Sequence, residues 1–392
     1  MPLPLYLLAL AVFAMGTSEF MLAGLLPDIA ADLEVTVGAA GLLTSAFAVG
    51  MVVGAPLLAA FARNWPTRLS LLVFVLVFAA AHVVGASTSS FPVLVATRVV
   101  AALANAGFLA VALTTAAELV PPGMKGRALA ALLSGTTVAT IAGVPGGSVL
   151  GALFGWRAVF WAVAALCLPA AIGILTGIPA GAAREGGTGE PSLRSELAQL
   201  RTPRLILVMV LGALVNAATF ASFTFLAPVV TDTAGLGELW ISVVLVLFGA
   251  GSFVGVSIAG RLSDRRPGLV MAVGGPLLLV GWPTLAALAE RPVALLVLVF
   301  VQGALSFALG GTLITRVLYE AAAAPTMAGS YATAALNVGA AVGPLVAAPT
   351  LNTAMGGLGP LWVSGLLVAT ALLVAFLFRA VIAVGRNEEV LR

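Results

Sequence analysis

Gly16-Thr17-Ser18-Glu19-Phe20-Met21 lies inside an otherwise apolar run from about Leu5 to Pro27. A run of about 20 apolar residues is long enough to cross the hydrocarbon core of a bilayer as one helix. Glu19 falls well inside this run, where a charged group is energetically unfavourable and is usually retained for a function. The stretch therefore predicts a membrane-spanning helix that carries one functional carboxyl group.

The composition excludes an ordinary water-soluble protein. Of the 392 residues, 61% are hydrophobic and 8% are charged, whereas about 25% of residues are charged in a typical soluble domain. Apolar surface on this scale needs lipid as its solvent. The net charge of +3 comes with no basic motif for nucleic acid, and the single cysteine, Cys167, excludes an internal disulfide and a cysteine-based metal site. We therefore predict an all-α membrane protein with no metal site and no nucleic-acid partner.

Apolar runs predict about twelve membrane-spanning helices. They lie near residues 5–27, 37–61, 68–87, 91–119, 127–153, 157–178, 204–230, 237–262, 268–289, 292–318, 327–351 and 358–383. The stretch from Pro179 to Pro203 is polar and is typical of a linker, with a short helix around Leu193–Leu200. We expect an N-terminal six-helix half at 1–178, a cytoplasmic linker at 179–203 and a C-terminal six-helix half at 204–392.

The basic residues sort by side of the membrane. With the N-terminus in the cytoplasm, the outer side receives only Arg157 and Arg291. The inner side then collects Arg63, Arg68, Lys125, Arg127, Arg184, Arg194, Arg201, Arg204, Arg261, Arg265, Arg266, Arg316, Arg379, Arg386 and Arg392. Because cytoplasmic loops carry the excess of basic residues, we expect both termini in the cytoplasm. Arg98 is left over, inside the fourth span.

The two halves repeat one another. Pro27 and Pro228 close spans one and seven and lie 201 residues apart, and Pro145 and Pro344 in spans five and eleven lie 199 residues apart. Similar offsets indicate a tandem duplication. Parallel repeats with a site near the midplane between them are a known plan of membrane transporters.

Glu19 and Arg98 are an acid and a base at matching depth. Glu19 lies roughly 12 Å from the outer end of span one, and Arg98 lies roughly 10 Å from the outer end of span four. Burial favours the neutral acid, whereas a nearby guanidinium favours the carboxylate, so a carboxyl balanced between them can load and release a proton. The alternative is a static buried ion pair that only fixes helix packing. We favour the functional interpretation because charges inside membranes are usually functional.

Span five carries a stripe of small residues. Its members recur every four residues and are Gly135, Ala139, Gly143, Gly147 and Gly151. Such stripes let helix backbones approach closely, and the pair Pro145-Gly146 permits a bend. The spacing leaves open a rocking contact between the two halves and a tight static helix crossing.

Four groups of residues form recognisable motifs. They are Gly16-Thr17-Ser18-Glu19-Phe20 with Gly24-Leu25-Leu26-Pro27-Asp28-Ile29, Arg98 with Gly107, Gly143-Val144-Pro145-Gly146-Gly147, and Gly155-Trp156-Arg157. In these motifs, and over essentially its whole length, the chain resembles the major facilitator superfamily. Within it the chain is most similar to the twelve-span drug:proton antiporters, and among those to the chloramphenicol-resistance exporters.

The resemblance implies two pseudo-symmetric six-helix halves and export by alternating access. In that family the acid of span one carries the proton and the arginine of span four couples to it, which assigns these roles to Glu19 and Arg98. The resemblance also implies a conformational role for Gly143, Pro145 and Gly147 in the antiporter motif. The proton gradient would drive transport, with no cofactor.

One loop departs from the family's pattern. The loop between spans two and three normally reads Gly-x-x-x-Asp-Arg-x-Gly-Arg, but here Phe61-Ala62-Arg63-Asn64-Trp65-Pro66-Thr67-Arg68 contains no acid. The second-half copy keeps Asp264 beside Arg265. We therefore place the gating role on Asp264 and Arg265.

A pocket for a small, partly polar drug needs aromatic walls and a few hydrogen-bonding groups. The candidates are Met15, Phe20, Met21, Asn105, Asn216, Phe223 and Tyr331. Polar side chains also hold membrane helices together, so packing is the alternative for each polar candidate. We expect His82, near the outer end of span three, to pack rather than to titrate, and Trp156 to act as an interfacial anchor.

Other functions lack their characteristic residues. Lys125 is the only lysine and does not lie in the phosphate-binding loop of an ATP-driven pump, and no cluster of His, Asp and nucleophiles favours an enzyme. We predict a proton-coupled antibiotic or multidrug exporter, with chloramphenicol as the expected substrate. Its partners would be the drug, protons and the lipid bilayer of a bacterial cell membrane, and we expect a monomer. An exporter of sugars or another small metabolite, and an uncoupled facilitator, are the alternatives.

Overall fold

The computed structural model describes residues 2–61, 65–121, 124–178, 193–262, 267–324 and 327–379, and within these ranges the regular structure is entirely helical. Within these ranges, twelve helices are long and apolar enough to cross a membrane, from Leu3–Gly24 to Gly356–Leu377. The twelve predicted spans are confirmed, with ends that differ by a few residues. The predicted linker helix is also present as α10 (Leu193–Ala198).

The first half contains six long helical units. They are α1 (Leu3–Phe20), α4 (Leu42–Phe61), α5 (Thr67–Ser87), α6 (Phe91–Glu118), α7 (Lys125–Val138) continued by α8 (Val144–Phe154), and α9 (Trp156–Gly177). Two short helices, α2 (Leu26–Asp32) and α3 (Val37–Ala40), connect α1 to α4.

The second half follows the same order. Its long helices are α11 (Pro203–Thr224), α13 (Leu239–Leu262), α14 (Pro267–Leu288), α15 (Pro292–Glu320), α16 (Ala328–Ala347) and α17 (Gly359–Leu377). The short α12 (Leu226–Pro228) follows α11, as α2 follows α1.

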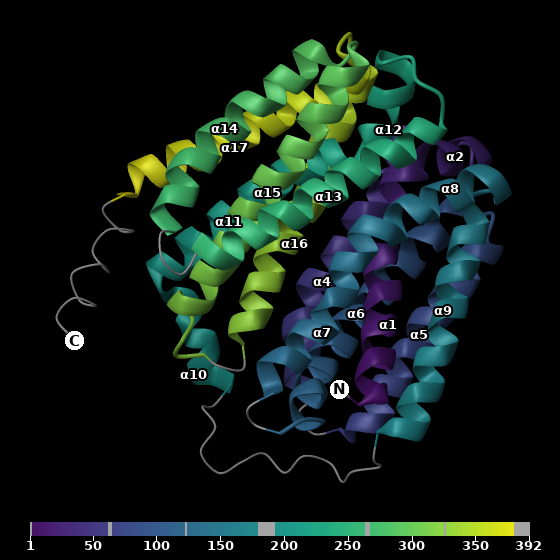
Figure 1. The fold of residues 1–392 in the computed structure, drawn as a ribbon, viewed down its shortest axis with the longest axis vertical. Coiled ribbons are helices and arrows are strands. Elements are labelled where there is room, and N and C mark those ends of the chain that lie inside the picture. The colour runs from purple at the N-terminus through teal and green to yellow at the C-terminus, as the bar shows by residue number, and fades with distance from the viewer. Residues whose placement is uncertain are drawn as a thin grey trace.

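Equivalent helices of the two halves pack in equivalent pairs (Figure 1). In the first half α4 packs on α6, α1 on α7 and α5 on α9. In the second half α13 packs on α15, α11 on α16 and α14 on α17. The six-plus-six arrangement is therefore pseudo-symmetric, as the repeated prolines indicate.

Two helix pairs join the halves. The helix α4 packs along α16, where the Ser45 hydroxyl donates to the Ala341 carbonyl at 2.8 Å and the Ser330 hydroxyl to the Ala55 carbonyl at 3.4 Å. The helix α13 packs mainly on α8 and on the π-helical turn Ala139–Gly143. We call the end of the bundle with α2 and α12 the far end, and the end with α10 and the start of α1 the near end (Figure 1). Since α12 also contacts α2, the halves are packed together at the far end.

Prolines set the breaks in two spans. The helix α1 ends at Phe20, a 3₁₀ turn covers Met21–Gly24, and Pro27 lies in the first turn of α2. Proline has no N–H to continue the preceding helix and clashes with the carbonyl four residues earlier. The same effect explains the π-helical turn before Pro145, at the bend predicted for span five.

The small-residue stripe of span five packs within the first half. A Cβ at Gly135 would collide with the Ala9 carbonyl, and one at Gly143 would collide with the Thr17 hydroxyl, both on α1. The contact with the second half uses another face, where Gly249 of α13 lies against the Thr140 carbonyl. Of the two interpretations that the spacing left open, the stripe matches the tight helix crossing.

A close backbone contact between α13 and α15 gives a stability prediction. A Cβ on Gly251 would collide with the Phe300 carbonyl oxygen, and backbone cannot move aside as a side chain can. Gly251→Ala should lower the free energy of unfolding by about 1–3 kcal/mol, the usual range for overpacking. The check is thermal unfolding in detergent, with Gly146→Ala as the matched control, because Gly146 has open space at its Cβ position. Equal melting temperatures for the two variants would contradict the packing.

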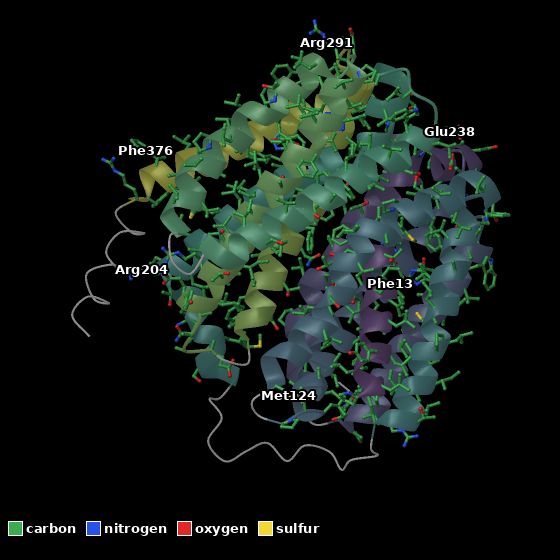
Figure 2. The ribbon with its side chains drawn as sticks, in the orientation of Figure 1. Phe13, Met124, Arg204, Glu238, Arg291 and Phe376 are labelled. Carbon is green, nitrogen blue, oxygen red and sulfur yellow. The ribbon has the colours of Figure 1, made fainter. Side chains whose placement is uncertain are left out.

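Two carboxyl groups at the far end give a pH prediction. Burial, and then the negative charge of Glu238, raise the pKa of Asp28 above its ordinary value of 3.8. Asp28 belongs to α2, whereas Glu238 precedes α13 of the other half and lies at the far end (Figure 2). Since the raised pKa belongs to the packed arrangement, packing at the far end should strengthen as pH falls through that raised value and weaken as pH rises above it.

The distance between spin labels on Ala31→Cys and Leu239→Cys measures this change. It should lengthen as pH rises in the parent chain, and Asp28→Asn should remove most of the lengthening. Glu290→Gln, a change at another far-end turn, should leave the pH dependence unchanged. A distance that is independent of pH in the parent chain would contradict the prediction.

Candidate functional site

The break at the end of α1 places Glu19 beside the interface of the halves. Glu19 is half-buried and lies in the last turn of α1. Among the described residues it has no hydrogen bond and no ion pair within 4.0 Å, and Arg98 is the charged group that acts on it electrostatically. The carboxyl is therefore inside a membrane span without a fixed partner.

Arg98 is fully buried and is fixed by groups other than Glu19. Its Nη1 donates to the Ser18 hydroxyl at 2.7 Å and its Nη2 to the Ser18 carbonyl at 2.8 Å. That carbonyl is free to accept because the last carbonyls of a helix have no partner within the helix. The Phe47 ring covers the guanidinium, with 4.5 Å from Cζ to the ring centroid.

The expected proximity of Glu19 and Arg98 is thus found, but not a direct contact between their charged groups. The helices α1 and α6 adjoin, as mutual neutralisation requires. The alternative interpretation, a static buried ion pair, does not match the structure, because Arg98 is bound to the residue before Glu19. The Nε of Arg98 has no hydrogen-bond partner, so one donor of the guanidinium is unused.

A small cavity lies next to this site, between the halves. Its wall includes residues of both halves: Phe20, Thr140, Val144, Thr219, Phe220, Phe223, Leu245, Phe248, Gly249, Ser252 and Phe307. Phe20 follows Glu19 directly in the chain, so the carboxyl group and the cavity share a turn of α1.

Phenylalanine rings form most of the cavity wall. The Phe20 ring centroid lies 5.8 Å from Phe220 and 6.2 Å from Phe223. Phe223 lies 4.8 Å from Phe248, which lies 6.1 Å from Phe307. These distances are typical of interacting aromatic pairs, and an aromatic ligand could extend the cluster.

The hydroxyl groups of the cavity can accept but not donate. Thr140, Thr219 and Ser252 each donate their hydrogen to a carbonyl of their own helix, at 2.9, 3.0 and 2.7 Å. Each oxygen keeps a lone pair for a ligand. No charged residue belongs to the lining, so the cavity suits an uncharged ligand with an aromatic ring and hydrogen-bond donors.

Of the seven predicted drug-binding residues, two line the cavity and three are buried elsewhere in the first half. Phe20 and Phe223 line the cavity. Met15 and Met21 are fully buried in the hydrophobic core of the first half, and Asn105 is buried on α6 with its Oδ1 unpartnered.

Two further candidates hold helices together instead of lining the cavity. Asn216 Nδ2 donates to the Leu336 carbonyl of α16 at 2.7 Å. The Tyr331 hydroxyl donates to the Glu196 backbone carbonyl at 2.8 Å, and the Glu196 carboxylate accepts the Met327 N–H at 2.8 Å. The structure thus places Tyr331 where α10 docks onto α16, outside the lining of this cavity.

Of the predicted conformational residues, Gly143, Pro145 and Gly147 are buried at the bend between α7 and α8. Asp264 and Arg265 lie outside the described residues. Within the described part of the chain, no group of three His, Cys, Asp or Glu side chains could hold a metal ion.

Sequence reasoning missed Phe220, Phe248 and Phe307, which complete the aromatic wall. One pattern could have found Phe220: it lies three residues before Phe223, which places both rings on one face of a helix. Its offset from Glu19 is also 201 residues, the offset of the internal repeat. For Phe248 and Phe307 the sequence gives no comparable spacing.

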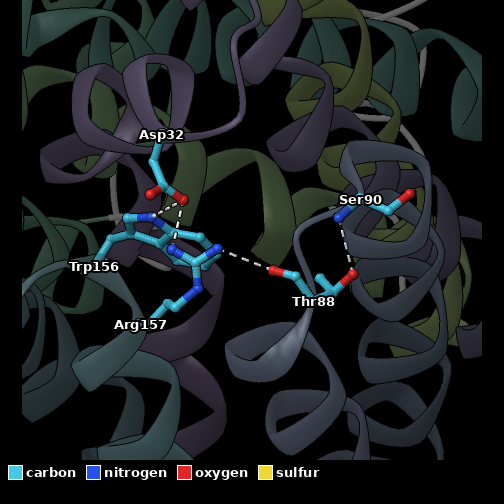
Figure 3. A network of polar contacts seen from close by, with 5 residues as sticks. All are labelled: Asp32, Thr88, Ser90, Trp156 and Arg157. Carbon is cyan, nitrogen blue, oxygen red and sulfur yellow. Dashed lines mark hydrogen bonds and ion pairs between the residues drawn. The ribbon is translucent and has the colours of Figure 1, made fainter.

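A polar network ties the far end of the first half (Figure 3). Arg157 Nη1 donates to Asp32 Oδ2, Arg157 Nη2 donates to the Thr88 carbonyl at 3.1 Å, and Trp156 Nε1 donates to the same Asp32 oxygen at 3.3 Å. Trp156 is buried, so its predicted role as an interfacial anchor is wrong. The network joins the last turn of α2, the residue that follows α5 and the first turn of α9.

Comparisons with known proteins agree with this fold. The family model described as Major Facilitator Superfamily matches residues 8–335. A "Chloramphenicol resistance protein" of Streptomyces lividans is 78% identical over 392 residues, 100% of both chains. The "Inner membrane transport protein YdhP" of Escherichia coli (strain K12) is 31% identical over 353 residues, 90% of each chain.

Two solved structures share the fold at low identity. A bacterial homologue of the human lysosomal transporter Spinster, in an inward-facing and unoccupied conformation, matches with a TM-score of 0.72 and 19% identity, covering 95% of this chain and 94% of that chain. The nucleoside transporter NupG, in a mutant form, matches with a TM-score of 0.74 and 14% identity, covering 96% and 98%. Together with the twelve apolar helices, these findings describe a multi-pass membrane protein. The chain belongs to the Major Facilitator Superfamily, the family that its motifs indicated.

Proposed function

We propose that this protein is a proton-coupled antiporter that exports an uncharged aromatic drug, with chloramphenicol as the expected substrate. The proposal rests on the position of the Glu19 carboxyl, which has no hydrogen bond or ion pair among the described residues. It lies in the same turn of α1 as Phe20, whose ring lines the aromatic cavity. A relative that matches the whole chain at 78% identity and is named a chloramphenicol resistance protein supports the choice of drug.

The near end would face the cytoplasm of a bacterial cell. Arg201 and Arg204 lie between α10 and the first turn of α11, whereas Glu238 lies at the far end (Figure 2). An excess of basic residues on one side supports a cytoplasmic location of that side. The packed far end would then close the cavity from outside, so the drug would enter from the cytoplasm or the inner leaflet.

The position of the cavity suggests how binding could drive the change of access. Phe20, Thr140 and Val144 come from the first half, whereas the remaining wall comes from the second half. A ligand that contacts both halves stabilises whichever arrangement it fits best. Drug and proton would compete, since a proton on Glu19 changes the charge at the edge of the cavity.

The energy for export would come from the proton gradient. In the inward-facing state Glu19 is a carboxylate and the drug occupies the aromatic cavity. A proton that enters from outside neutralises Glu19, weakens the electrostatic hold of Arg98 and favours release of the drug outward. The protein itself needs no cofactor for these steps.

Glu19→Gln tests the proton carrier. Glutamine keeps the shape of the side chain but cannot ionise, so efflux of chloramphenicol from loaded vesicles under an imposed pH gradient should fall to background. Binding of the drug to the purified variant should remain measurable but weaker than in the parent chain, because the neutral amide resembles the protonated Glu19 that favours release. Efflux by the variant at the parent rate would dismiss Glu19 as the carrier and favour an uncoupled facilitator, and no drug movement by the parent chain would favour a metabolite exporter.

Phe223→Ala and Phe248→Ala test the cavity. Each removes a ring in contact with other rings, and the loss of about 1 kcal/mol of aromatic contact together with apolar area should weaken drug binding about tenfold. Phe253→Ala is the matched control, because Phe253 lies on α13 like Phe248 but is exposed at the surface of the bundle. The measurement is the dissociation constant by titration calorimetry, and equal constants for all three variants would move the binding site elsewhere.

A further inference from the structure

A buried chain of hydrogen bonds begins at Arg98 and ends at His82 on α5. Arg98 Nη1 contacts the Ser18 oxygen Oγ at 2.7 Å, and the same Oγ lies 2.7 Å from His82 Nε2. His82 Nδ1 lies 2.8 Å from the Phe78 carbonyl oxygen. Ser18, His82 and Arg98 are each at most 1% exposed, so water does not compete for these groups.

The direction of every bond in this chain follows from chemistry. A carbonyl oxygen can only accept, so His82 Nδ1 carries a hydrogen and donates to Phe78. A guanidinium can only donate, so the Ser18 oxygen accepts from Arg98. In the neutral imidazole Nε2 then carries the lone pair, and the hydroxyl hydrogen of Ser18 points at it. This one arrangement is consistent with all of these contacts, and it leaves Arg98 Nε without a partner among the described residues.

The arrangement determines where the guanidinium rests. His82 fixes the direction of the Ser18 hydroxyl hydrogen, and this keeps a lone pair of the same oxygen directed at Arg98. The ring of His82 is in turn fixed between aromatic rings, with centroids 4.3 Å from Phe78 and 5.6 Å from Phe160. The imidazole therefore holds the Ser18 hydroxyl in the orientation in which its oxygen accepts from Arg98.

We propose that His82 is a positioning residue that keeps Arg98 on Ser18 and so leaves Glu19 free to exchange its proton. Without an acceptor at Nε2, the Ser18 hydroxyl turns away and the guanidinium loses a partner. Arg98 then pairs with Glu19, the adjacent acid, and a direct ion pair holds Glu19 as a carboxylate. The inference rests on the proposed proton coupling.

His82→Phe and His82→Gln form the main comparison. Phenylalanine keeps a ring among Phe78 and Phe160 but accepts no hydrogen bond, whereas the amide oxygen of glutamine can accept from Ser18. In His82→Phe, gradient-driven drug efflux should fall about tenfold, as expected for a lost hydrogen bond that positions a charged group, while the drug dissociation constant stays the same. His82→Gln should restore most of the efflux.

Ser18→Ala provides an independent second variant, because it removes the bridging hydroxyl without changing α5. It should lower efflux as His82→Phe does, and the double variant should be no worse than either single one. Ser70→Ala is the control and should leave efflux unchanged, since Ser70 is a buried serine of α5 whose one bond within the described part of the chain goes to the Pro66 carbonyl. Melting temperatures of all variants report whether they fold.

The outcomes separate the two proposals. If Glu19→Gln retains full gradient-driven efflux, the proposed function fails. If Glu19→Gln abolishes efflux while His82→Phe and Ser18→Ala transport at the parent rate, only the positioning role is overturned. Loss of efflux in His82→Phe that glutamine does not restore, or that is accompanied by weaker drug binding, also overturns it.

Discussion

The structure depends on one electrostatic constraint, a carboxyl group that has to be accommodated inside an apolar span. Glu19 is not neutralised by a direct ion pair, because Arg98 is held by Ser18 and by the ring of Phe47. The end of α1 at Phe20 frees the carbonyl that Arg98 uses. The same break brings Phe20 to the aromatic cavity, so the acid, its nearby base and the cavity meet at one turn of one helix.

Hydropathy predicted the fold well because the bilayer leaves few choices. A span must be helical and about 20 residues long, so the twelve apolar runs gave twelve helices with small errors at their ends. The internal repeat also followed from the sequence, through Pro27 and Pro228. The family resemblance agrees with the match of the family model to residues 8–335.

The site could be predicted only in part. Glu19 and Arg98 stand out because charges are rare in spans, but the partner of Arg98 depends on how α1 and α6 are rotated. Asn216 and Tyr331 were chosen by residue type, and both proved to bond to backbone carbonyls elsewhere. The aromatic wall joins residues from α1, α11, α13 and α15. These helices are far apart in the sequence, and only tertiary packing brings their rings together.

The most direct measurement is proton release on drug binding by the purified protein in weakly buffered detergent. If drug and proton compete through Glu19, adding chloramphenicol should release protons in proportion to the drug bound, and Glu19→Gln should bind the drug without releasing any. Proton release that is the same in the parent chain and in Glu19→Gln would contradict the central role of Glu19. Binding of the drug by the parent chain without proton release would contradict it as well.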